Sequence, residues 1–157
     1  DIVHPALEVL LHAGTLASVL VFYWRKISAL SIGCLRREAQ AIRYAAYLIL
    51  ATLPAVVAYS VFGEFFESIF DKALCISIFL IFTGLLLLST KVIWNRASGK
   101  VMDGVHALLV GCAQAVAVLP GVSRSGSTIS TAKWLGISTE EAFEFSFLMS
   151  IEEGENT

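Results

Sequence analysis

Three long apolar runs alternate with short charged stretches over the first hundred residues. The runs cover residues 5–24, 42–62 and 73–94. Each is close to the roughly 20 residues that a helix needs to cross the hydrocarbon core of a bilayer. The pattern therefore predicts three membrane-spanning helices, joined by polar linkers at residues 27–43 and 63–72.

The apolar stretch at residues 103–119 predicts a different element. As a helix it would rise about 25 Å, which reaches mid-depth in the membrane or slightly beyond. A polar turn follows at residues 119–128 (LPGVSRSGST), and the next apolar piece, 128–135, is too short to cross. We therefore expect a re-entrant hairpin that leaves the membrane on the side where it entered. A further apolar helix is predicted at residues 142–151, with Ser138 or Thr139 as its N-cap.

Composition places the chain among helical membrane proteins. Hydrophobic residues make up 57% and charged residues 15%, and the mean hydropathy is +0.77, which lies outside the range of soluble domains. We expect an all-α, polytopic transmembrane bundle whose broken-helix hairpin is part of an inverted-repeat fold. The predicted domain covers residues 1–151, is incomplete at both ends, and is followed by an atypical charged tail at 152–157. Nothing in the sequence suggests a nucleic-acid partner.

Other candidate chemistry is sparse. The cysteines Cys34, Cys75 and Cys112 form no CxxC pair, and we interpret them as packing residues. Glu8 and His12 lie four residues apart in the first span. They could form an intramembrane proton relay, or they could simply lie in the outer turns of the helix.

The polar turn has the groups that bind an oxyanion. Arg124 supplies a forked cation, its neighbours supply hydroxyls, and N–H groups at the start of the following helix point toward a bound anion. Helix capping would explain the serine and threonine residues but not Arg124. A guanidinium between apolar stretches is costly in a membrane and usually marks a functional site.

Two segments resemble a known family. Residues 111–114 (GCAQ) together with 119–128 resemble the second signature of the bacterial undecaprenyl-diphosphate phosphatases of the bacitracin-resistance (BacA/UppP) type. Residues 140–148 (EEAFEFSFL) look like the segment that follows this signature, and 7–22 is similar to the helix after the family's first signature. That first signature, a Glu-rich helix with a Pro-x-Ser-Ser-x-Gly-His turn, would lie upstream of Asp1. The chain thus looks like the central piece of a larger protein.

The resemblance implies a bacterial, multi-pass plasma-membrane hydrolase. Its reaction would convert undecaprenyl (polyprenyl) diphosphate to the monophosphate plus phosphate, which recycles the lipid carrier of cell-wall synthesis and gives bacitracin resistance. The expected partners are this lipid substrate and membrane lipids, and a homodimer is also considered. The resemblance further suggests a divalent cation, Mg²⁺ or Ca²⁺, although the sequence itself shows no ligands for it and the metal stays unknown.

The expected site lies on the hairpin. Arg124 would bind a phosphate group through two hydrogen bonds, and the catalytic set is Arg124, Ser123 and Ser125. The phosphate-binding set is Gln114, Gly121, Arg124, Ser125, Gly126 and Thr128. For Gln114 a purely structural role is equally open, and His106 is a weaker candidate. The general base is expected upstream of residue 1.

Two other classes of function compete with the hydrolase. A transporter or flippase of a lipid phosphate or small anion could use the same broken-helix plan. A structural bundle, in which the polar turn only packs helices, would tolerate replacement of Arg124.

Charge counting predicts the orientation of the chain. Basic residues dominate the loops at 25–43 and 91–100, which places them in the cytoplasm, whereas 63–72 is acidic and should face outward. In a background without native cysteines, Ser98→Cys should resist an impermeant maleimide added to intact cells. Labelling of this variant from outside would reverse the predicted orientation.

Overall fold

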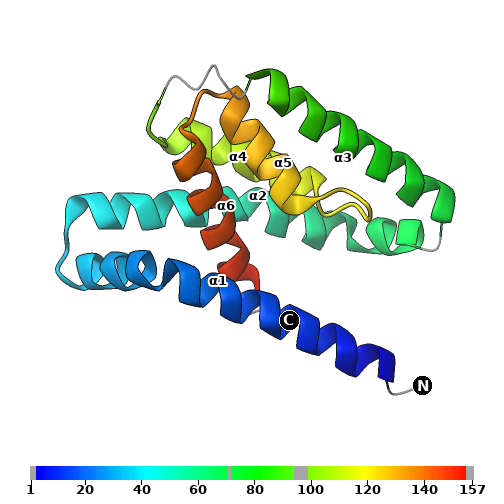
Figure 1. Ribbon diagram of the computed structural model, residues 1–157, viewed down its shortest axis with the longest axis horizontal. Helices are drawn as coiled ribbons and strands as arrows, with labels where there is room; N and C mark the ends of the chain where they lie inside the picture. The colour runs from blue at the N-terminus through cyan, green and yellow to red at the C-terminus, as the bar shows by residue number, and fades with distance from the viewer. Residues whose placement is uncertain (1–2, 71, 94–98, 155–157) are drawn as a thin grey trace.

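The computed structural model describes residues 3–70, 72–93 and 99–154, and this part of the chain is helical apart from turns and one isolated bridge between Lys100 and Ile137. The all-α prediction is confirmed (Figure 1). The helices are α1 (Val3–Leu35), α2 (Ala39–Phe70), α3 (Ala73–Ile93), α4 (Gly104–Val116), α5 (Arg124–Trp134) and α6 (Thr139–Gly154).

Three of these helices are long and apolar enough to cross a membrane. The candidate spans are Ala13–Leu35 in α1, Ala39–Phe65 in α2 and Ala73–Val92 in α3. Most of their large apolar side chains are exposed, as expected for helices that face lipid or further helices rather than water. The protein is therefore a multi-pass membrane protein, as predicted.

The predicted polar linkers were wrong in extent. The segment 27–43 is mostly helical, because α1 continues to Leu35 and α2 begins at Ala39. Likewise, α2 continues through most of 63–72 and ends at Phe70. Charged residues alone do not end a helix, because their long side chains can reach out of the apolar layer while the backbone stays helical.

The end of α1 is fixed by its own backbone. Arg37 adopts a left-handed conformation with φ of 56°. The amide of Glu38 donates to the Gly33 carbonyl at 2.9 Å, and the amide of Arg37 donates to the Cys34 carbonyl at 3.1 Å. This pair of bonds is the Schellman motif, which ends a helix by giving hydrogen-bond donors to its last carbonyl groups.

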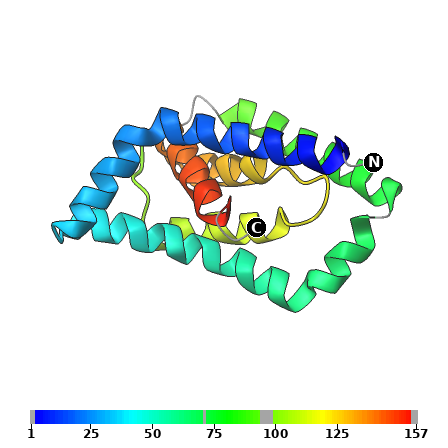
Figure 2. The ribbon, with the colours of Figure 1, turned by 90° about the horizontal axis from the view of Figure 1, so that it is seen from below.

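Helices α4 and α5 form the predicted re-entrant hairpin. Their connecting turn points toward the end of the bundle where α2 meets α3, and the chain enters α4 and leaves α5 away from that end (Figures 1 and 2). One boundary was predicted wrongly: α5 begins at Arg124, one turn before Thr128. The reason is Ser123, whose side chain caps the helix by accepting a hydrogen bond from the Gly126 amide at 3.2 Å.

The core lies where α2, α4, α5 and α6 meet. Small residues bring α2 and α4 close together, because Ala51 and Ala55 on α2 and Ala107 on α4 are all buried. A Cβ atom on Gly111 would collide with the carbonyl oxygen of Ala51. Small residues four apart on both helices are the usual device for close packing in membranes.

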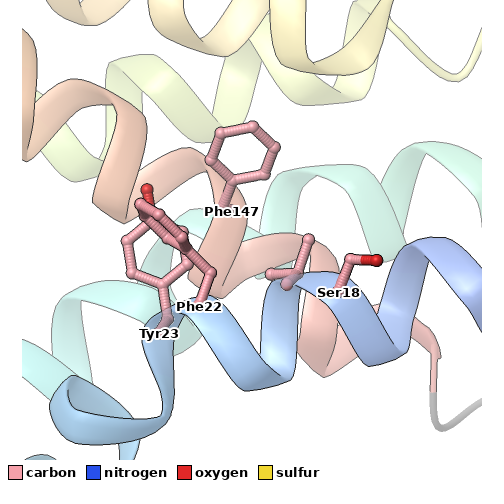
Figure 3. Close-up of a pocket in the computed structure, with 5 residues that line it drawn as sticks. Ser18, Phe22, Tyr23 and Phe147 are labelled. Carbon is pink, nitrogen blue, oxygen red and sulfur yellow. The ribbon is translucent and has the colours of Figure 1, made fainter.

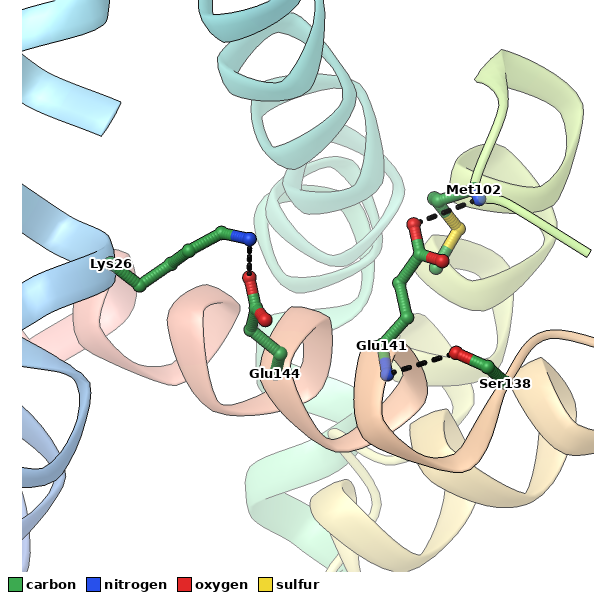
Figure 4. A network of polar contacts seen from close by, with 5 residues as sticks. All are labelled: Lys26, Met102, Ser138, Glu141 and Glu144. Carbon is green, nitrogen blue, oxygen red and sulfur yellow. Dashed lines mark hydrogen bonds and ion pairs between the residues drawn. The ribbon is translucent and has the colours of Figure 1, made fainter. Parts of the chain in front are cut away.

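The base of the hairpin is tied to the start of α6. The Lys100 amide donates to the Gly136 carbonyl at 3.1 Å, and the Met102 amide donates to Glu141 Oε1 at 3.0 Å. Ser138, one of the two N-cap candidates, accepts from the Glu141 amide at 3.3 Å (Figure 4). These bonds hold the start of α4 and the end of α5 together at the open end of the hairpin.

Two neighbouring contacts attach α6 to α1. Glu144 forms an ion pair with Lys26 at 2.8 Å (Figure 4). Phe147 lies beside Tyr23, with ring centroids 5.9 Å apart, at a shallow apolar hollow that Ser18 and Phe22 also line (Figure 3).

The backbone of α6 stays helical to Gly154 and so enters the segment 152–157, which we predicted as a charged tail. Residues 155–157 lie outside the described part, and the domain boundaries stay predictions.

The close contact at Gly111 predicts how two identical substitutions should differ. In the full-length protein, Gly111→Ala should lower the free energy of unfolding by about 1–3 kcal/mol, because the new methyl group must push α4 away from α2. Gly84→Ala is the matched control: a Cβ there meets nothing within 4 Å, so it should be neutral or slightly stabilising. Thermal unfolding in detergent measures both. Equal unfolding temperatures for the two variants would contradict the close α2–α4 contact.

Candidate functional site

The tip of the hairpin is a tight turn set by proline and glycine. The Val122 amide donates to the Leu119 carbonyl at 3.1 Å, so Pro120 and Gly121 occupy the two central positions. Gly121 has a φ of 91°. Proline followed by a residue with positive φ is the signature of a type II turn. The sequence LPGV therefore dictates the reversal.

Helix α3 is packed tightly against this turn. A Cβ on Gly121 would lie 2.7 Å from the Ile76 carbonyl oxygen and 3.3 Å from the Phe79 Cβ. Gly121 thus meets two requirements that exclude other residues, a positive φ and a close approach to another backbone.

Thr83 of α3 binds the turn on both sides of Val122. Its hydroxyl donates to the Gly121 carbonyl at 3.2 Å and accepts from the Ser123 amide at 3.2 Å. Neither backbone group has a partner within a helix. If buried without a hydrogen bond, each would cost about 1–3 kcal/mol.

These contacts also give the depth of the turn. Ile76 and Thr83 lie about 5 and 15 Å along α3 from its first residue, Ala73, at 1.5 Å per residue. The turn therefore lies in the half of α3 that is nearer to the α2–α3 connection. In the predicted orientation this is the outer half of the membrane.

The predicted catalytic residues lie together at the start of α5. Arg124 and Ser125 are exposed in the first turn of the helix. Ser123 is the N-cap, so its oxygen accepts from the Gly126 amide and its proton can still be donated to another group. The N–H groups at the helix start accompany Arg124, rather than Thr128 as the sequence suggested. A cation, two hydroxyls and a helix N-terminus thus lie within one helical turn.

Two predicted phosphate-binding residues lie behind this surface. Thr128 is 1% exposed, and its Oγ1 lies 2.6 Å from Ser146 Oγ on α6. Gln114 on α4 is also 1% exposed. Phosphate contacts by these two side chains stay predictions, and their buried positions do not favour them.

The weaker candidates lie elsewhere. His106 Nδ1 is 2.9 Å from Oδ1 of Asp103, the residue that caps α4. The backbone N–H of His106 also donates to this carboxylate and lowers the pKa of Asp103. His106 therefore belongs to a helix cap. Glu8 and His12 lie in α1, but their side chains are outside the described part of the chain.

The described residues do not fit a divalent-cation site on their own. Among the described side chains, His, Cys, Asp and Glu form no group of three that could bind a metal. The tip of the hairpin offers hydroxyls and a cation, whereas Mg²⁺ and Ca²⁺ prefer carboxylate oxygens. The expected cation stays untested.

Sequence reasoning missed Thr83. A threonine inside the most apolar helix, in the string IFTGLLLL, could have indicated a hydrogen bond to another segment, because polar side chains in a membrane usually form hydrogen bonds between helices. The sequence could not identify that partner, which lies 38 residues away in the chain.

The sequence matches a known protein family over nearly its whole length. The sequence profile of the family described as "Bacitracin resistance protein BacA" matches residues 2–152. An undecaprenyl-diphosphatase of Methanococcus maripaludis is 41% identical over 142 residues, which cover 90% of this chain and 57% of that protein. An undecaprenyl-diphosphatase of Syntrophotalea carbinolica is 40% identical over 148 residues, with 92% and 56% covered.

A third relative is more distant. The protein named undecaprenyl-diphosphatase 2 of Oenococcus oeni is 35% identical over 147 residues, with 90% of this chain and 53% of that protein covered. This chain therefore spans little more than half the length of the relatives it matches. The profile match over nearly the whole chain, together with these identities, shows that the chain belongs to the BacA family.

Proposed function

We propose that the full-length protein containing this chain hydrolyses a polyprenyl diphosphate, in particular undecaprenyl diphosphate, to the monophosphate and phosphate. The relatives carry this activity in their names. The observation that supports it most strongly is Arg124, an exposed guanidinium in the first turn of α5 beside Ser123 and Ser125.

The site suits a phosphoryl group that gains charge during reaction. Arg124 would donate two parallel hydrogen bonds to oxygens of the terminal phosphate. Ser123 and Ser125 would add hydroxyl donors, and the positive end of the α5 dipole would favour the same anion. Donors that are fixed before the reaction begins stabilise the transition state without reorganisation.

The reaction itself is a transfer of the terminal phosphoryl group to water. The water oxygen forms a bond to the terminal phosphorus, and the bond from that phosphorus to the bridging oxygen breaks. The bridging oxygen stays on the lipid monophosphate, and a base must remove a proton from the water. The described residues near Arg124 supply charge stabilisation, so we place the base in the remainder of the protein.

The divalent cation belongs to that remainder too. We propose that carboxylates outside the described residues would bind Mg²⁺ or Ca²⁺, which would supply further positive charge for the diphosphate. The roles proposed for Arg124, Ser123 and Ser125 do not depend on the metal.

The depth of the turn suits a lipid substrate. In the predicted orientation the backbone of Arg124 lies near mid-depth, because its neighbours Ser123 and Gly126 lie beside Thr83 and Leu87 of α3. Its long side chain would meet a headgroup that enters from the outer half of the membrane. The isoprenoid tail would then lie along apolar faces of α2 and α3, where Phe62 and Phe82 are exposed and Phe79 is half-buried. Membrane lipids would cover the other exposed faces, and a homodimer is a further arrangement that these faces could support.

Arg124→Lys should reduce turnover of the full-length enzyme by about 10²–10³-fold, the usual loss for one preorganised donor. An ammonium group cannot make the two parallel bonds of a guanidinium. The measurement is phosphate release from a polyprenyl diphosphate in detergent. Arg43→Lys, an exposed position on α2 far from the turn, is the matched control and should keep normal activity. Near-normal turnover of Arg124→Lys would refute the role of Arg124.

Residues 1–157 expressed alone should release no phosphate above background and should fold poorly. The hairpin lacks the group that removes a proton from water, and its exposed apolar faces lack the remainder of the protein. The assay compares this chain with the full-length protein under the same conditions. Turnover within about tenfold of full length would mean that the base lies inside this sequence, with Glu8 and His12 as first candidates.

The transporter alternative predicts a different result in liposomes. Counterflow of a lipid phosphate or small anion, without phosphate release by the purified full-length protein, would replace the hydrolase proposal. Phosphate release in detergent, where no transport can occur, supports it.

A further inference from the structure

We infer that Thr83 is a positioning residue for the reaction proposed above: its hydroxyl fixes the hairpin turn and thereby the direction in which Arg124 and Ser123 present their donors. This inference rests on the proposed function. Thr83 itself lies on α3 and need not contact the substrate.

The hydroxyl of Thr83 differs from its neighbours on the same helix. Ser77, Ser89 and Thr90 of α3 all donate back to carbonyls of α3 itself, three or four residues earlier. Thr83 instead donates to the Gly121 carbonyl and accepts from the Ser123 amide, both at 3.2 Å. A hydroxyl has one proton, so donation to the turn is made at the expense of a bond within α3.

The position of these two bonds connects Thr83 to the site. Ser123 is both the residue whose amide Thr83 accepts from and the N-cap of α5. Its backbone direction sets the axis of the first helical turn, which carries Arg124. The bond to Gly121 fixes the other side of the turn. A shift of this turn would displace the guanidinium relative to a bound phosphate, and errors of about 1 Å can cost about 10²-fold in rate.

The packing around Thr83 limits the alternatives. Thr83 is 6% exposed. Ile76 and Phe79, both beside Gly121, and Leu87, near Gly126, lie on the same face of α3 and are apolar. Their side chains can make van der Waals contacts with the turn but cannot form hydrogen bonds to its backbone. Of the α3 residues that contact the turn in the described part of the chain, Thr83 supplies the hydrogen bonds.

The test compares isosteric changes at two threonines in the full-length protein. Thr83→Val keeps the shape and removes the hydroxyl. It should lower kcat for a polyprenyl diphosphate by about 10–100-fold with a KM within about threefold, because the donors act mainly in the transition state. Thr83→Ser should recover activity to within about threefold, because it restores the hydroxyl. Thr90→Val is the matched control: Thr90 is 7% exposed on the same helix, and among the described residues its hydroxyl donates to the Leu87 carbonyl of that helix. It should leave kcat unchanged.

A second measurement needs no activity. Backbone hydrogen exchange over residues 121–126 should be faster in Thr83→Val than in Thr90→Val, because the Ser123 amide loses its acceptor. If Thr83→Val fails to fold, Thr83→Cys provides a small, weak donor of similar shape. It should give a smaller loss of kcat in the same direction.

The outcomes separate the two proposals. Equal kcat for the valine variants at 83 and 90 would overturn the positioning role, whatever the exchange shows. Equal exchange as well would mean that Thr83 does not fix the turn at all. If the wild-type protein releases no phosphate, the proposed function fails and the positioning role fails with it, while faster exchange in Thr83→Val would still establish the bond to the turn.

Discussion

Backbone groups inside a membrane must find partners within the protein, because water is not available to bind them. The turn at residues 119–122 meets this constraint with its own bond from Val122 to Leu119 and with one side chain from another helix, and Ser123 caps the start of α5 that follows. That side chain is Thr83, which binds the backbone on both sides of Val122. Without such bonds the chain could not reverse at this depth, and Arg124 would have no fixed place.

The rest of the bundle can be understood as support for this turn. Gly111 lets α4 lie directly against Ala51 of α2, which fixes one arm of the hairpin. The second arm, α5, packs against α3 at its start, where Gly126 lies near Leu87, and against α6 through the hydroxyls of Thr128 and Ser146. Polar groups in α5 thus divide into two sets. Arg124 and Ser125 at its start are exposed and suited to an anion, whereas Thr128 and Lys133, farther along, bind α6.

The sequence predicted the class and the plan of the fold because both follow from local pattern. Run length and charge identified the spans, and Pro120 with Gly121 identified the reversal. Helix ends were less predictable: the charged segment 27–43 stays helical except at residues 36–38 because its side chains can reach polar surroundings, and Ser123 starts α5 a turn early. In the site, Arg124 and Ser125 were identified by chemistry that is local to the motif. Thr83 and Gly111 depend on contacts between distant segments, which residue type alone does not encode.

We propose that Arg124 binds a phosphate group at the tip of the hairpin. The most direct test of this proposal is a phosphorus-to-nitrogen distance measurement by solid-state NMR. The full-length protein would carry ¹⁵N-arginine in a lipid bilayer, with a non-hydrolysable methylene-bridged analogue of the lipid diphosphate bound. We expect a short contact between a guanidinium nitrogen and the terminal phosphorus, and this contact should be lost in Arg124→Lys. A contact of equal strength in this variant, or none in the wild-type protein with the analogue bound, would contradict it.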